Sequence, residues 1–233
     1  MAFTDILETA FGWAFRAFPY KKALVWLDMI TKPHQTMQKE LKNASVMEGI
    51  KDLYIFYLSV YAVVITILVV VIFVAALFTG KGTNLNLATT VASIALLIGM
   101  ILFTPLLLVL FSLIGNVFTF VPAKFFGGKG TFKQQFYLDT QVAVGVNFMA
   151  FTLHGMLILF MFIPLINIIA LLVFSIVSVS ILAYWLYLAI KVLRLVHGFS
   201  RIKAVCSYFL TWIIAIVVPL ALYVIIEYLL GKN

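Results

Sequence analysis

The sequence has few charged residues and a single cysteine. Asp, Glu, Lys and Arg make up 10% of its 233 residues, whereas a soluble domain usually carries about 25%. With one cysteine, Cys206, an intrachain disulfide is excluded, and we interpret this residue as a small apolar packing residue rather than a nucleophile. Low charge combined with 65% hydrophobic residues indicates an integral membrane protein.

The chain also lacks the common patterns of catalytic and metal-binding residues. It contains no H-E-x-x-H and no G-x-S-x-G, and His34, His154 and His197 fall in three separate regions. Residues 80–83 and 128–131 both read GKGT, but a phosphate-binding loop needs Ser or Thr directly after its lysine, between a strand and a helix. We therefore expect a protein that is not an enzyme and uses no metal or other cofactor.

The sequence contains several long apolar runs. About 20 apolar residues cross a hydrocarbon core of about 30 Å as a helix. Residues 63–78 are apolar at both odd and even positions apart from Thr66, which argues against the alternation of barrel strands. Ser45 and Glu48 have the spacing of a capping box, so the first long helix is expected to begin at Val46. The sequence predicts an all-α membrane fold with an N-terminal segment, 1–45, and a membrane domain, 46–233, whose spans are 53–78, 87–121, 138–163, 165–196 and 204–230.

The positive charges favour five spans over six. The run at 87–121 is long and contains Pro105, so it has the alternative of two short crossings. With five spans and an inside N-terminus, all 16 Lys and Arg except Lys81 and Lys232 lie on the inner side, as the positive-inside rule expects. We therefore predict a cytoplasmic N-terminus and an external C-terminus. The formal net charge of +8 is then a matter of topology, so we expect no nucleic-acid partner.

The segment before the first span has an amphipathic pattern. On a helical wheel, residues 4–18 place apolar side chains on one arc and Asp5, Glu8 and Arg16 on the other. We predict a helix that lies on the cytoplasmic leaflet, with Trp13 and Trp26 at headgroup depth. The alternative is a helix packed against the membrane bundle.

The third span carries the only polar constellation in the apolar runs. Asp139, Asn147 and His154 share one face of its helical wheel. Ionisable residues inside a membrane are costly unless partnered, so they are candidates for a polar path or a ligand contact. The alternative is ordinary hydrogen bonding between helices, with Asp139 at the cytoplasmic interface.

Three blocks of the sequence resemble the Yip (Ypt/Rab-interacting protein) domain family, of Yip-one type. They are Pro33 with KELKNASVMEGIKD at 39–52, FGGKGTF at 126–132, and the stretch from Trp185 to Ala204 that ends in HGFSRIKA. Their order, their spacing and the five-span topology agree with the family. In physical terms, the first turn offers glycines that permit positive φ, and Gly198 breaks the helix in the second. The family-like turn residues are Gly127, Gly128, Lys129, Gly130, Trp185, His197, Gly198, Ser200 and Lys203.

The resemblance implies a non-enzymatic protein of membrane organisation. Eukaryotic relatives act in vesicle traffic and membrane shaping, bind small GTPases and associate with other members. They carry a longer polar N-terminus, in whose place this chain has the apolar amphipathic segment. This departure argues against a small GTPase as partner and suggests a bacterial or archaeal member in the plasma membrane, with an ER or Golgi membrane as the alternative.

The sequence therefore leads to two hypotheses of function. The first is a scaffold or adaptor that binds the lipid bilayer, other membrane proteins or a second copy of itself. The alternative is a small transporter or channel that uses the polar face formed by Asp139, Asn147 and His154.

Overall fold

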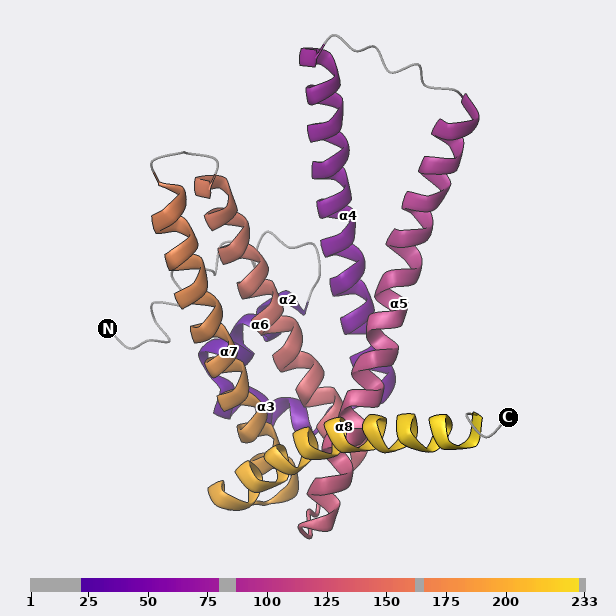
Figure 1. Cartoon of the computed structure of the whole chain (residues 1–233). Coiled ribbons are helices and arrows are strands. Elements are labelled where there is room, and N and C mark those ends of the chain that lie inside the picture. The colour runs from indigo at the N-terminus through magenta and orange to yellow at the C-terminus, as the bar shows by residue number, and fades with distance from the viewer. Residues whose placement is uncertain (1–21, 80–86, 162–165, 231–233) are drawn as a thin grey trace. The chain divides into compact units, whose positions relative to one another are not determined.

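The computed structural model describes residues 22–79, 87–161 and 166–230, and in these ranges it is built of helices (Figure 1). Contacts divide the chain into two compact units, of which one is Ile50–Leu113 and the other combines the residues up to Gly49 with those from Ile114 onward. The second of these is called the main unit below. The helices are α2 (Ala23–Thr31), α3 (Pro33–Leu41), α4 (Val46–Thr79), α5 (Leu87–Phe125), α6 (Phe132–Met161), α7 (Asn167–His197) and α8 (Arg201–Leu230).

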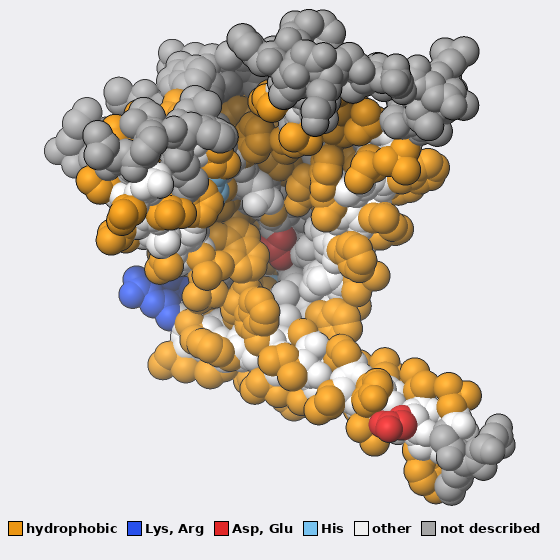
Figure 2. All heavy atoms as spheres, turned by 45° about the horizontal axis from the view of Figure 1, so that its top comes forward, with side chains coloured by type: hydrophobic (Ala, Val, Ile, Leu, Met, Phe, Trp, Pro, Cys, Tyr) orange, Lys and Arg blue, Asp and Glu red, His pale blue; other side chains and the backbone are white. Residues whose placement is uncertain are grey.

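Within the described residues, five helices are long and apolar enough to cross a membrane, which confirms the predicted number of spans. The spanning segments are Val46–Val71, Ala95–Phe125, Phe132–Ile158, Asn167–His197 and Arg201–Leu230. The helix α5 runs without interruption through Pro105, so the alternative of two short crossings in this run is wrong. Figure 2 shows hydrophobic side chains over most of the visible surface of the described helices, as expected for a protein that faces lipid.

Local side-chain hydrogen bonds explain where several helices begin. The backbone N–H of Glu48 donates to Ser45 Oγ at 3.5 Å, and α4 begins at Val46 as predicted. At the start of α6, Thr131 and Gln134 form a reciprocal capping box that the sequence analysis missed. The N–H of Gln134 donates to Thr131 Oγ1 at 3.3 Å, and the N–H of Thr131 donates to Gln134 Oε1 at 3.0 Å.

Two short helices, α2 and α3, pack against α6 and α7 inside the main unit. Trp26 is fully buried, and its Nε1–H donates to Gln141 Oε1 of α6 at 3.0 Å. The backbone of α2 comes so close to α6 that a Cβ on Gly145 would lie 2.7 Å from the carbonyl oxygen of Trp26. The expectation that Trp26 sits among lipid headgroups is therefore wrong, because an apolar stripe that fits lipid fits a helix bundle equally well. The predicted amphipathic helix at 4–18 lies outside the described residues.

Polar contacts add to this packing. The hydroxyl of Tyr137 on α6 donates to Glu40 Oε2 of α3 at 2.7 Å, in a buried position. The hydroxyl of Tyr184 on α7 donates to the carbonyl oxygen of Ile30 at the end of α2. An ion pair of 2.7 Å joins Lys22 to Glu48. These bonds hold the N-terminal segment to α4, α6 and α7, where a buried polar group needs a partner.

Candidate functional site

The two glycine-containing turns lie against each other in the main unit. One turn, Phe126–Thr131, connects α5 to α6, and the other, Gly198–Ser200, connects α7 to α8. The backbone N–H of Lys129 donates to the carbonyl oxygen of His197 at 3.3 Å, which joins the turns directly. We call these two turns and the helix ends beside them the turn junction. Two blocks that the sequence analysis singled out separately thus form one structure.

Glycine is required in the turn junction for two different reasons. Gly127 and Gly198 have positive φ, 79° and 69°, and each ends a helix. Gly128 and Gly130 do not, so the expectation of positive φ is wrong for these two. They are needed because the chains pass too closely for a Cβ, which would lie 2.7 Å from the carbonyl oxygen of Ala123 at position 128 and 2.5 Å from that of Val196 at position 130.

A buried polar chain runs through the turn junction. His197 is 1% exposed, and its Nε2 lies 2.8 Å from Gln135 Oε1. The Nε2 of Gln135 donates to Thr119 Oγ1 at 2.6 Å. Since the amide oxygen of Gln135 accepts, the neutral imidazole carries its proton on Nε2. Its Nδ1 has no hydrogen-bond partner among the described residues.

Gly128 explains why Nδ1 of His197 is left without a partner. A Cβ on Gly128 would collide with this nitrogen, so the backbone of the first turn covers it. Aromatic rings close the other sides: Phe199 stacks on the imidazole at a centroid distance of 5.4 Å, and Phe120 lies at 5.8 Å. His197 is thus a closed structural group rather than an accessible acid, base or metal ligand.

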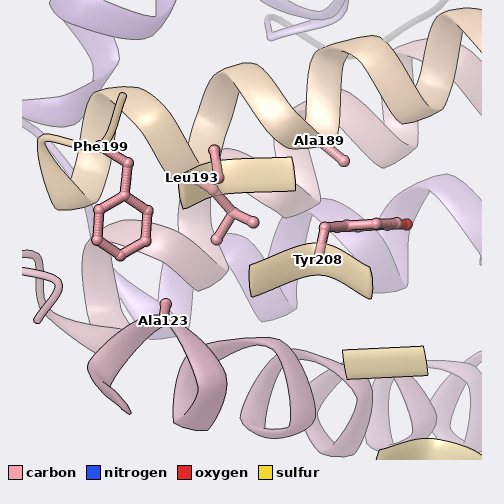
Figure 3. Close-up of a cluster of buried hydrophobic side chains, with 6 residues drawn as sticks. Ala123, Ala189, Leu193, Phe199 and Tyr208 are labelled. Carbon is pink, nitrogen blue, oxygen red and sulfur yellow. The ribbon is translucent and has the colours of Figure 1, made fainter. Parts of the chain in front are cut away.

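A hydrophobic cluster lies beside this polar chain and joins α5, α7 and α8. Figure 3 shows Phe199 and Leu193 directed toward the helix that carries Ala123. Tyr208 of α8 completes it and meets Trp185 of α7 edge to face, with ring centroids 6.2 Å apart. The cluster consists of the buried side chains of Ala123, Ala189, Leu193, Phe199, Ala204 and Tyr208.

Polar and basic side chains lie beside both turns. Ser200 Oγ accepts a hydrogen bond of 3.4 Å from the backbone N–H of Lys203, at the start of α8. The side chain of Lys203 is exposed. Lys124, at the end of α5, donates to the carbonyl oxygen of Gly128 at 3.1 Å and lies over the ring of Phe120.

The structure spreads the three polar candidates of α6 over different surroundings. Asp139 is half-buried, one turn from Gln135. Asn147 has an exposed side chain. His154 lies deep in the apolar part, where its Nε2 is 2.9 Å from Ser178 Oγ of α7 and its ring lies 4.4 Å from that of Phe174. At about 1.5 Å per residue, Asp139 and His154 are roughly 22 Å apart along the helix.

Sequence reasoning missed several residues that hold the site together. Gln135 and Thr119 supply the polar chain beside His197, while Gln141, Tyr137 and Glu40 fasten the short helices. One signal was available, because Gln134, Gln135, Asp139 and Gln141 cluster in the first turns of an otherwise apolar helix. Within the ranges that the structure describes, no group of three His, Cys, Asp or Glu side chains has the arrangement of a metal site.

The comparisons with known proteins give no relative from which a role can be carried over. No family model, no curated protein and no solved structure matches this chain. The Yip resemblance therefore remains an expectation from the sequence blocks alone.

Proposed function

We propose that this chain is a non-enzymatic membrane scaffold or adaptor, which binds partner membrane proteins or lipid through its long helices. We place the turn junction on the cytoplasmic side, in agreement with the positive charges that surround it. This role is also the one that the Yip resemblance implies.

One observation carries the proposal. The first part of α8 is anchored, since Ala204, Ser207, Tyr208 and Thr211 are buried. From Trp212 to Leu230 every side chain of α8 is exposed except Ile214, which is half-exposed. A helix in a membrane bundle ordinarily packs one stripe against its neighbours. The outer part of α8 thus presents an anchored surface that is apolar on all sides apart from Glu227, as suits the attachment of a partner.

The polar residues of α6 give less support to a transporter or channel than to a scaffold. A transport path needs polar groups that follow one another across the membrane and that water reaches. His154 instead bonds to Ser178, in the manner of ordinary hydrogen bonding between helices.

Photo-crosslinking in native membranes tests the proposal. A photoreactive amino acid is placed singly at Ile216 and Leu220, which share one face of α8, and at Val218 and Leu222 on the opposite face. A partner gives discrete protein adducts from one of these faces and not from the other. Only lipid adducts from all four positions would contradict the partner-binding role.

A further inference from the structure

A recess with a basic lining lies between the end of α7 and the start of α8. Its volume is about 270 Å³, and no acidic side chain lines it. Three of the six lining residues are cations, and Ile190 and Val205 supply an apolar wall. The full lining is Tyr187, Ile190, Lys191, Arg194, Arg201 and Val205. We call it the basic recess.

The cations of the basic recess are not neutralised by carboxylates of the described chain. The ion pair found in these ranges joins Lys22 to Glu48 and involves none of them. Lys191 is positioned by Tyr187, whose hydroxyl oxygen lies 3.4 Å from Nζ and whose ring centroid lies 5.5 Å away. Three uncompensated positive charges that converge on one recess attract an anion.

Arg194 supplies the planar cationic group of the basic recess. Its Nε is buried and has no hydrogen-bond partner among the residues that the structure describes. The chain itself covers this Nε, so a ligand in the basic recess meets the terminal nitrogens of the guanidinium. Guanidinium groups bind phosphate oxygens with two parallel hydrogen bonds, which the two terminal nitrogens can donate.

The position of the recess in the fold indicates which class of anion it binds. Tyr187 and Lys191 stand one turn apart near the end of a spanning helix, as is typical of the headgroup region. Arg201 is the first residue of α8, where the helix dipole favours a negative charge. The apolar wall of Ile190 and Val205 suits the glycerol and the first acyl carbons of a lipid.

We propose that the basic recess binds the phosphate group of an anionic phospholipid, with Arg194 as the bidentate donor and Lys191 and Arg201 as flanking charges. This inference rests on the proposed function, in that it names one lipid ligand of the scaffold. A bound lipid neutralises the positive charge between α7 and α8. It thereby stabilises the anchored start of α8.

A second recess extends the basic surface. It has a volume of about 310 Å³ and is lined by Lys32, Pro33, His34, Gln35 and Lys191. Lys191 is common to both recesses, which places the junction between α2 and α3 beside the lipid site. A lipid bound at Lys191 therefore lies within reach of the N-terminal helices as well.

Native mass spectrometry of the full chain released from nanodiscs tests the site. The nanodiscs contain phosphatidylcholine mixed with phosphatidylglycerol, and bound lipids are identified on the released protein. We expect the parent to retain phosphatidylglycerol in preference to phosphatidylcholine. Each of Lys191→Gln, Arg194→Gln and Arg201→Gln should weaken retention about five-fold, because a cation near the surface contributes about 1 kcal/mol.

Matched variants separate a built site from general attraction. Lys203→Gln removes an exposed charge near the start of α8. Lys203 does not line the basic recess, so this variant should retain the parent's preference for phosphatidylglycerol. Arg194→Lys keeps the charge without the planar guanidinium, so its lipid retention should fall between that of the parent and that of Arg194→Gln. If Lys203→Gln weakens retention as much as Arg194→Gln does, the site is overturned.

A second arm separates lipid from free phosphate. Inorganic phosphate is titrated into the parent in nanodiscs of phosphatidylcholine alone. Binding of inorganic phosphate that depends on Arg194, without any preference for phosphatidylglycerol, would overturn the lipid assignment. The crosslinks from α8 are measured separately, so a missing lipid preference overturns this site and leaves the adaptor role standing.

Discussion

Gly128 lies directly against the imidazole of His197, so that a Cβ at position 128 would be 2.8 Å from the Cγ of the ring. The same Cβ would lie 2.7 Å from the carbonyl oxygen of Ala123. The contact therefore joins the end of α5, the first turn and the end of α7. It is one of the close approaches within the turn junction, beside the one between Gly130 and Val196.

Gly128→Ala should destabilise the protein. The added methyl group meets backbone as well as the ring, and overpacking of this kind costs about 1–3 kcal/mol. The measurement is thermal unfolding in detergent. Gly155→Ala is the matched control, because a Cβ there meets nothing within 4 Å. It should be neutral or slightly stabilising, and equal melting temperatures for the two variants would contradict the close approach.

The bond between Gln135 and His197 should appear as a coupling energy. Gln135→Leu leaves Nε2–H of His197 buried without an acceptor, at a cost of about 1–3 kcal/mol. His197→Phe alone leaves the amide oxygen of Gln135 buried without its donor from His197. The double variant removes both groups, so its loss of stability should be clearly smaller than the sum of the two single losses. Strict additivity in this double-mutant cycle would show that the hydrogen bond does not form.

Trp26 should contribute far more to stability than Trp212. Trp26 is fully buried between α2 and α6, whereas Trp212 on α8 is 52% exposed. Trp26→Ala should cost about 3–5 kcal/mol, through lost packing and through loss of the hydrogen bond to Gln141. Trp212→Ala should lower the unfolding temperature only slightly. Similar losses for both would mean that Trp26 faces lipid, as the sequence pattern first predicted.

The sequence predicts the spans well because run length and charge asymmetry are properties of the chain alone. The start of α4 and the end of α7 can also be predicted from the sequence, since Ser45 and Gly198 act on residues close to them in the chain. The hydrogen bond between His197 and Gln135 cannot be predicted in this way, because the two residues are 62 positions apart. A helix that is apolar on every side does not indicate which side meets another helix, so its buried contacts remain undetermined by the pattern.

The candidate site shows the same limit. A helical wheel placed Asp139, Asn147 and His154 on one face, but a wheel carries no information on depth along the helix. The structure places Asp139 near the turn junction and His154 beside Ser178. The turns at 126–132 and 197–204 were each recognised as special, whereas their mutual contact depends on tertiary structure.

The orientation can be tested with two cysteines in a Cys206→Ala background. Thr83 falls in the segment between the first two spans, and Thr131 falls in the first turn of the turn junction. An impermeant thiol reagent added outside intact cells should label a cysteine at position 83 and spare one at 131. Labelling after permeabilisation is the control for reactivity at position 131. The reverse pattern would invert the proposed topology and move the basic recess to the external side.

Replacement of His154 should affect stability and not conduction. Hydrogen bonds between helices in a membrane average about 0.6 kcal/mol, so loss of the contact between His154 and Ser178 should lower the unfolding temperature only slightly. Ser178→Ala removes the same bond from the other side and should give a similar decrease. Parent proteoliposomes should conduct ions and protons no faster than empty vesicles, because a lone histidine bonded to a serine makes a poor relay. A conductance in the parent that His154→Ala abolishes would falsify the scaffold role and establish the transporter in its place.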